Sequence, residues 1–182
     1  MSLTASPTLA LADLANGIHN LHAVRGAVFC QAGAVCLDAQ GHVSGVPMQV
    51  DGNFAEAFSV TFPDVTDQMR KSWRDSIEAT YNGATGIAIL LVRMLTGFTV
   101  IKQSVIGSGF DWLLGPETTD EEGIFQTTVR LEISGILRGD ETKIRKRVKE
   151  KLHQTEQSDS WDVPAYVVVV EFSEPRSRVV QK

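Results

Sequence analysis

The stretch "RLEISGIL", residues 130–137, has the length and apolar content of a buried strand but carries one carboxylate. Side chains alternate between the two faces of a strand, so Glu132 shares a face with Arg130 and Ser134. The leucine and isoleucine that flank Glu132 then point into a core. An unpaired charge away from water is very costly. We therefore expect the Glu132 carboxylate either to have a hydrogen-bond or ion-pair partner or to serve a function.

The segment "GFDWLLG", residues 109–115, places Asp111 in a similar apolar run. Two successive predicted strands, Phe110–Leu114 and Ile124–Ile136, thus carry one acid each. We expect Asp111 and Glu132 to lie side by side on neighbouring strands, with their carboxylates facing a common solvent-accessible pocket. Two like charges that close repel each other, so without a cation one of them should have a raised pKa.

The surrounding elements alternate between strand and helix patterns. Apolar residues at helical spacing predict a long helix over Ser72–Leu95, with Ser72 as its N-cap. The segment "RGDETKIRKRVKEKLHQTEQ" is typical of an amphipathic basic helix with an apolar stripe of Ile144, Val148 and Leu152. Two more strands are predicted over Phe98–Ile106 and Ala165–Phe172, the second buried on both faces.

The N-terminal part of the chain has a different character. Residues 9–40 are alanine-rich and predict helix, residues 36–52 are punctuated by glycine and predict turns, and Phe58–Phe62 alternates like a short strand. The sequence therefore predicts an α/β (α+β) fold: a mixed central sheet flanked by helices, in the order α-β-β-β-α-β. We expect a single domain over 1–182, with an N-terminal helical segment (1–45) and an α/β core (72–175).

The composition excludes several classes of protein. A chain of 182 residues with 43% hydrophobic and 21% charged residues is an ordinary globular domain, and its net charge of −5 gives no global indication of nucleic acid or an anionic membrane. No apolar run is long enough to span a bilayer, and the N-terminus lacks the pattern of a signal peptide. Cys30 and Cys36 have no metal-ligand spacing around them, which favours reduced thiols in a cytoplasmic protein.

Over roughly Ser72–Ser173, this order of elements and acids resembles the restriction-endonuclease-like superfamily, the PD-(D/E)XK phosphodiesterases. In that superfamily one acid begins the second core strand, and a second acid and a lysine lie two residues apart on the third. Asp111 and Glu132 match the two acids. The stretch "RLEISGI" is also similar to bacterial protein families that imply no activity.

The resemblance implies a metal-dependent nuclease or nuclease-like phosphodiesterase that acts on a nucleic acid. It further implies Mg²⁺ or Mn²⁺ held by Asp111 and Glu132, with Glu78 on the first helix as a supporting ligand. The chemistry of phosphodiester hydrolysis independently favours two acids at one site. A divalent ion bound by a few carboxylates neutralises phosphate charge and generates hydroxide near neutral pH.

The sequence departs from the superfamily at the lysine. Ser134 occupies that position, so the motif reads E-I-S, and phenylalanine rather than proline precedes Asp111. Lys102, on the preceding strand, is the best replacement, followed by Arg130 and Gln126. The predicted catalytic set is therefore Asp111, Glu132, Lys102 and Ser134.

The same acids also have structural interpretations. Asp111 could cap the turn formed by "GSG" at residues 107–109. Glu132 could pair with Arg130 on its own strand or with Lys102 across the sheet, and Glu78 could be a solvated helix residue.

The basic helix gives a second indication of function. Lys143, Lys146 and Arg147 are candidates for contacts with nucleic-acid phosphates, although interspersed acids also fit an ordinary solvated helix face. The alternative function is a noncatalytic binding or assembly protein that keeps the nuclease-like fold. Either protein is expected to be a homo-oligomer. Trp73 and Tyr81, on the first core helix, are predicted to be core residues.

Overall fold

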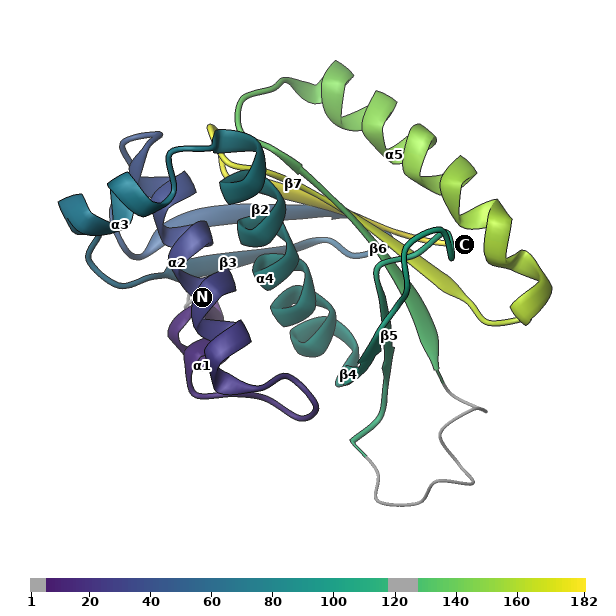
Figure 1. The fold of residues 1–182 in the computed structure, drawn as a ribbon. Coiled ribbons are helices and arrows are strands. Elements are labelled where there is room, and N and C mark those ends of the chain that lie inside the picture. Colours follow the sequence, from purple (N-terminus) through teal and green to yellow (C-terminus); the bar gives the residue numbers. More distant parts are fainter. Residues whose placement is uncertain (1–5, 118–127) are drawn as a thin grey trace, which may run out of the picture.

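One mixed sheet organises the part of the chain that the computed structural model describes, residues 6–117 and 128–182 (Figure 1). Its eight strands within these ranges lie in the order β1-β3-β2-β8-β7-β6-β5-β4. The strands are β1 (Thr8–Ala10), β2 (Val46–Gly52), β3 (Glu56–Thr61), β4 (Thr99–Gln103), β5 (Trp112–Gly115), β6 (Val129–Ile136), β7 (Ala165–Glu171) and β8 (Arg176–Gln181). The mixed α/β class predicted from the sequence is confirmed.

The second half of the chain forms one continuous part of the sheet. β4 and β6 are both antiparallel to β5, whereas β6 and β7 are parallel. A parallel pair needs a crossover connection, and helix α5 (Glu141–Thr155) provides it, followed by the short 3₁₀ helix η2 (Glu156–Trp161). The two halves of the sheet join where β8 pairs with β7 on one side and with β2 on the other.

Helix α4 (Ser76–Thr96) is the central helix of the core. Residues 83–92 are all buried, and the helix packs against β6, β7 and α2 (Ala23–Asp38). Glycines allow this close helix pair, because a Cβ added at Gly83 would lie 2.9 Å from the Cα of Gly33. The predicted long helix is thus confirmed as a buried core element.

The beginning of this helix differs from the prediction. Asp75, not Ser72, is the N-cap, and its carboxylate accepts hydrogen bonds from the backbone N–H groups of Ile77 and Glu78. Ser72 is instead the last residue of a separate short helix, α3 (Asp67–Ser72). Both Ser and Asp are good N-caps, so the sequence pattern did not distinguish the two positions.

The N-terminal predictions are confirmed only in part. Helix α2 and strand β3 form where expected, but β1 occupies the start of the predicted helical segment, before the short α1 (Ala12–Ala15). Residues 46–52, predicted as turns, form β2, and β8 was not predicted at all. Both strands are stabilised by hydrogen bonds to neighbouring strands. Local sequence propensity does not include this stabilisation, so it does not predict these strands.

Helix α5 covers the opposite face of the sheet from α2 and α4 (Figure 1). Its predicted apolar stripe of Ile144, Val148 and Leu152 packs on a cluster that includes Val167 and Val169 of β7, as expected. Strand β7 is buried along its whole length. The first residues of the predicted strand Ile124–Ile136, including Gln126, lie outside the described residues. Within the described ranges, no helix is both long and apolar enough to cross a membrane.

Candidate functional site

The two acids meet at a fork where β5 separates from β6. Pairing between these strands ends at Trp112 and Leu131, and Asp111 lies immediately before β5. The Asp111 backbone N–H still donates to the carbonyl of Leu131 (2.9 Å), while its Oδ2 accepts the N–H of Ile133 (2.8 Å). The Asp111 carboxylate therefore takes the place of a strand carbonyl as the acceptor for Ile133. These two hydrogen bonds hold Asp111 against β6.

Strand alternation places Glu132 as predicted. Leu131 and Ile133 belong to the core beneath α4, whereas Arg130, Glu132 and Ser134 contact residues of α5 or η2 on the other face. Glu132 is fully buried, and its Oε2 has no hydrogen-bond donor among the described residues. Its nearest interacting acid is Asp111. The expectation that the two carboxylates lie together is confirmed. The expectation that both face a common solvent-accessible pocket is wrong, because the strand and α5 bury Glu132 completely.

A lysine that the sequence analysis did not select completes the arrangement. Lys151 reaches from α5, and its Nζ donates to Glu132 Oε1 (2.5 Å) and to Gln154 Oε1 (3.1 Å). Lys102, the predicted replacement, is exposed on β4, and its side chain makes no hydrogen bond or ion pair with a described residue. The spacing of Lys143, Arg147 and Lys151 at every fourth residue of a helix was the available signal, because such residues share one face.

Burial and mutual repulsion shift the pKa of both acids. Burial, followed by the negative charge of Asp111, raises the pKa of Glu132 to about 7, although Lys151 opposes this shift. The pKa of Asp111 is also raised, mainly by burial and against the hydrogen bond from Ile133. Tyr81 donates to Asp111 Oδ1 (3.4 Å), and burial together with that acid raises the tyrosine pKa to about 12. Burial and the proximity of the two acids thus favour the retention of a proton by the pair.

The raised pKa of Glu132 predicts a pH-dependent stability. The folded chain binds a proton more tightly than the unfolded chain, whose glutamate pKa is near 4.5. The stabilisation is complete below about pH 4.5 and is lost as the pH rises to 7, which amounts to about 3 kcal/mol. Glu132→Gln should remove this loss, so its stability relative to wild type should be greater at pH 8 than at pH 5. Urea unfolding at both pH values measures it.

A matched substitution separates this effect from a general change in charge. Asp64→Asn removes an exposed acid that makes no hydrogen bond with a described residue, and its effect on the free energy of unfolding should be the same at both pH values. An equal effect of Glu132→Gln at pH 5 and pH 8 would contradict the assignment.

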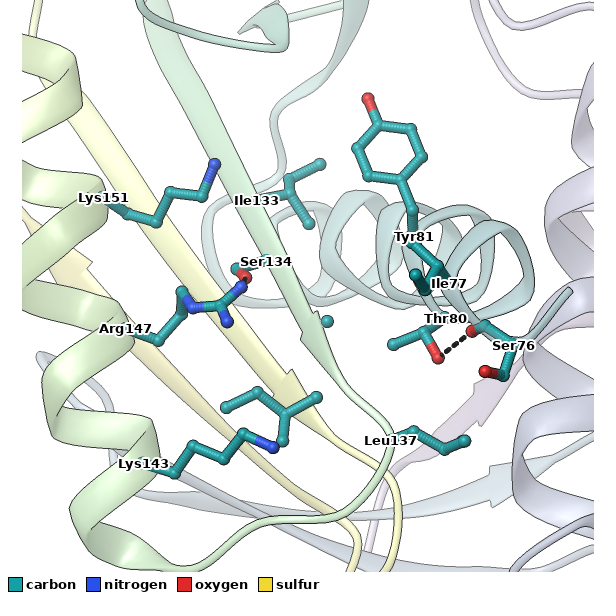
Figure 2. Close-up of a pocket in the computed structure, with 12 residues that line it drawn as sticks. Ser76, Ile77, Thr80, Tyr81, Ile133, Ser134, Leu137, Lys143, Arg147 and Lys151 are labelled. Carbon is teal, nitrogen blue, oxygen red and sulfur yellow. Dashed lines mark hydrogen bonds between the residues drawn. The ribbon is translucent and has the colours of Figure 1, made fainter.

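Two cavities flank the acid pair. The first, which we call the cationic cavity, has a volume of about 370 Å³ and lies between the start of α4, the end of β6 and α5. Lys143, Arg147 and Lys151 extend into it from α5 (Figure 2). The second, the polar cavity, has a volume of about 510 Å³ and includes Asp111 in its lining. Tyr81 lines both cavities, so it stands between them.

Tyr81 is a correction to the sequence analysis. It was predicted to be a core residue, but 45% of it is exposed. Its ring projects away from the axis of α4 instead of into the core (Figure 2). Trp73, by contrast, is partly buried and packs against the main core, as predicted.

The remaining predicted residues divide into two groups. Ser134 lies at the site, where its Oγ accepts a hydrogen bond from Arg147 Nη1 (2.9 Å). Arg130 is buried, but its guanidinium is directed to residues in and around η2. It donates to the carbonyls of Val163 and Thr155 and to Ser158 Oγ.

The structure leaves two predicted residues apart from the acids. Glu78 is exposed in the first turn of α4 and contributes to neither cavity. Lys146 points to solvent and pairs with Glu150 at 3.9 Å, whereas Lys143 and Arg147 line the cationic cavity. The structure thus brings together Asp111, Glu132, Ser134 and two of the three basic residues.

The acid pair offers carboxylate oxygens of the kind that a hard divalent ion binds. No cluster of three or more histidine, cysteine or acidic side chains able to hold a metal occurs in the described residues. Mg²⁺, however, commonly uses one or two carboxylates and completes its shell with water and substrate oxygens. The unsatisfied Glu132 Oε2 beside Asp111 is the oxygen such an ion would neutralise. Asp111 and Glu132 could therefore hold the ion without Glu78.

Comparison with known proteins finds no matching family model, no matching curated protein and no matching solved structure. The function is therefore inferred from the chemistry of the site.

Proposed function

We propose that the protein is a metal-dependent nuclease or nuclease-like phosphodiesterase that acts on a nucleic acid. The observation that carries the proposal is the group of Asp111, Glu132 and Lys151 at the fork of β5 and β6, next to the cationic cavity. The order α4-β4-β5-β6-α5-β7, with its antiparallel and parallel pairs, supports it as well, because this is the order that the family resemblance implies.

Each residue of this group has a distinct role in the proposed reaction. Mg²⁺ or Mn²⁺, when bound by Asp111 and Glu132, would polarise the phosphate and lower the pKa of water. Lys151 takes the part of the lysine that Ser134 replaces: its ammonium balances Glu132 in the free protein and orients the attacking water or stabilises charge on the phosphate. The Ile133 N–H and the Tyr81 hydroxyl hold the Asp111 carboxylate in place.

The row of cations on α5 would bind the substrate backbone. Lys143, Arg147 and Lys151 are four residues apart, which separates them by about 6 Å along the helix axis. All three line the cationic cavity, and none of the acidic residues in the described parts of the chain lines it with them. This local positive charge supports phosphate binding despite the net charge of −5.

The main alternative is a noncatalytic binding protein with the same fold. Its support is the close pairing of Lys151 with Glu132, which already compensates one acid without a metal. We favour the nuclease because a purely structural pair would not need the second acid, which raises the pKa of the first. The buried thiols Cys30 and Cys36 suit a reducing compartment, and we place the protein in the cytoplasm.

The test is cleavage of labelled single-stranded and duplex oligonucleotides with Mg²⁺, with Mn²⁺ or with EDTA. Wild-type protein should cleave only with a divalent ion, and the ion should raise the thermal midpoint. Lys151→Met should lower the rate about 100-fold, through the loss of one charged group at the reacting phosphate. Lys149→Met removes the same charge from an exposed position of α5 and should leave the rate unchanged.

Two results would contradict the proposal. Cleavage that is absent with both ions, together with a thermal midpoint that does not respond to either, would leave the binding protein as the better hypothesis. Equal rates for the Lys151 and Lys149 variants would remove the lysine from the catalytic group while retaining the acids.

A further inference from the structure

The polar cavity has the wrong charge for a phosphate. It lies beside Asp111, and Tyr81 separates it from the cationic cavity. Its described lining contains no lysine or arginine, and its one histidine, His153, is hydrogen-bonded to Glu156 (2.8 Å). Asp111 and Glu150 both contribute to it, so an anion there would be repelled. The polar cavity is therefore unsuited to a second phosphate.

Amide groups provide the hydrogen-bonding capacity of this cavity. Gln103 and Gln154 each accept a hydrogen bond at Oε1, from Arg25 and Lys151 respectively, which fixes the side chain. Neither NH₂ group donates to a described residue. The Gln157 amide makes no hydrogen bond with a described residue. Orientated amides that offer both donors and acceptors match the edge of a nucleobase.

Apolar surface accompanies the amides. The half-exposed Tyr81 ring forms one side of the cavity, and Val105 and Ile106 display almost their entire side chains at its mouth, on the loop between β4 and β5. A backbone hydrogen bond holds the start of this loop to β5, because the Ser104 N–H donates to the carbonyl of Asp111 (2.9 Å). It also packs closely on α5, where a Cβ at Gly109 would lie 2.9 Å from the Gln154 carbonyl oxygen.

We propose that the polar cavity binds one unpaired nucleobase next to the cleaved bond, stacked on Tyr81 and contacted at its edge by Gln154 and Gln157. This inference rests on the proposed nuclease function and narrows its substrate class to single strands, or to duplexes whose nucleotide is extruded at the site. A base held in a duplex stack cannot present both its face and its edge to a cavity. The phosphates would then follow the cationic cavity, on the other side of Tyr81.

Binding in EDTA tests the inference without cleavage. The probe is an oligonucleotide with one 2-aminopurine, free or annealed to its complement. We expect the single strand to bind at least tenfold more tightly than the duplex, with a change in 2-aminopurine fluorescence. Tyr81→Leu should weaken single-strand binding about tenfold through lost stacking. Tyr81→Phe loses the hydroxyl bonded to Asp111 but keeps the ring, so it should bind the single strand more tightly than Tyr81→Leu does.

A second variant keeps the test independent of α4. Ile106→Ser combined with Gln157→Ala changes only exposed side chains and should also weaken single-strand binding. Val43→Ser, at another exposed apolar position outside both cavities, should not.

The outcomes distinguish this inference from the proposed function. Equal affinity for single strand and duplex, no binding at low salt, or equal binding by Tyr81→Leu and Tyr81→Phe would overturn the nucleobase site, and metal-dependent cleavage could still stand. Selective binding of the single strand by a protein that cleaves nothing with Mg²⁺ or Mn²⁺ would support the site and refute the nuclease.

Discussion

Asp111→Asn should lower metal-dependent cleavage by roughly 10³-fold, because metal binding supplies several kcal/mol of transition-state stabilisation. The substitution is nearly isosteric, and the asparagine carbonyl can still accept the hydrogen bond from Ile133 N–H. The fold should therefore remain. The variant should also lose the rise in thermal midpoint that Mg²⁺ or Mn²⁺ produces in the wild type, since one of the two metal-holding carboxylates is gone.

The apo form of this variant provides a second measurement. Asp111 is the second cause, after burial, of the raised pKa of Glu132, so its neutralisation should lower that pKa and stabilise the folded protein slightly above pH 7. Asp64→Asn is the control, because it removes an exposed acid of the same type. If Asp111→Asn cleaved within tenfold of the wild-type rate, the acid pair would not be the metal site.

Leu91→Asp should prevent folding or reduce the free energy of unfolding by at least about 4 kcal/mol. Leu91 is completely buried in the most apolar part of α4, between α2 and the sheet. The substitution both removes core packing and places a charge far from water. Circular dichroism and chemical denaturation of the soluble fraction measure the effect.

Met94 provides the matched position for this substitution. It lies one turn further along α4, but half of it is exposed. Met94→Asp should change the free energy of unfolding by less than about 1 kcal/mol. Soluble expression of Leu91→Asp with an unchanged thermal midpoint would mean that α4 is not the central core helix.

Local patterns in the sequence were sufficient for the elements that decide the fold. The continuous apolar character of α4 and β7 predicted their burial, and the apolar stripe of α5 predicted which of its faces meets the sheet. Local patterns did not predict those strands whose extended conformation depends on pairing with neighbouring strands. Residues 46–52 of β2 contain a proline and a glycine, so their strand conformation depends on pairing with β3 and β8.

For the site, the sequence by itself determined the two acids, because each is the single carboxylate of an apolar run. The period of a strand determined the face of β6 on which Glu132 lies. The tertiary structure decided which cation serves them. Lys151 is 19 residues beyond Glu132 along the chain, and it reaches the acid only because α5 crosses back over the sheet with that turn above the fork. No local period encodes where a crossover helix lies above a strand. The packing of its apolar stripe, together with the close contact at Gly109, fixes that position.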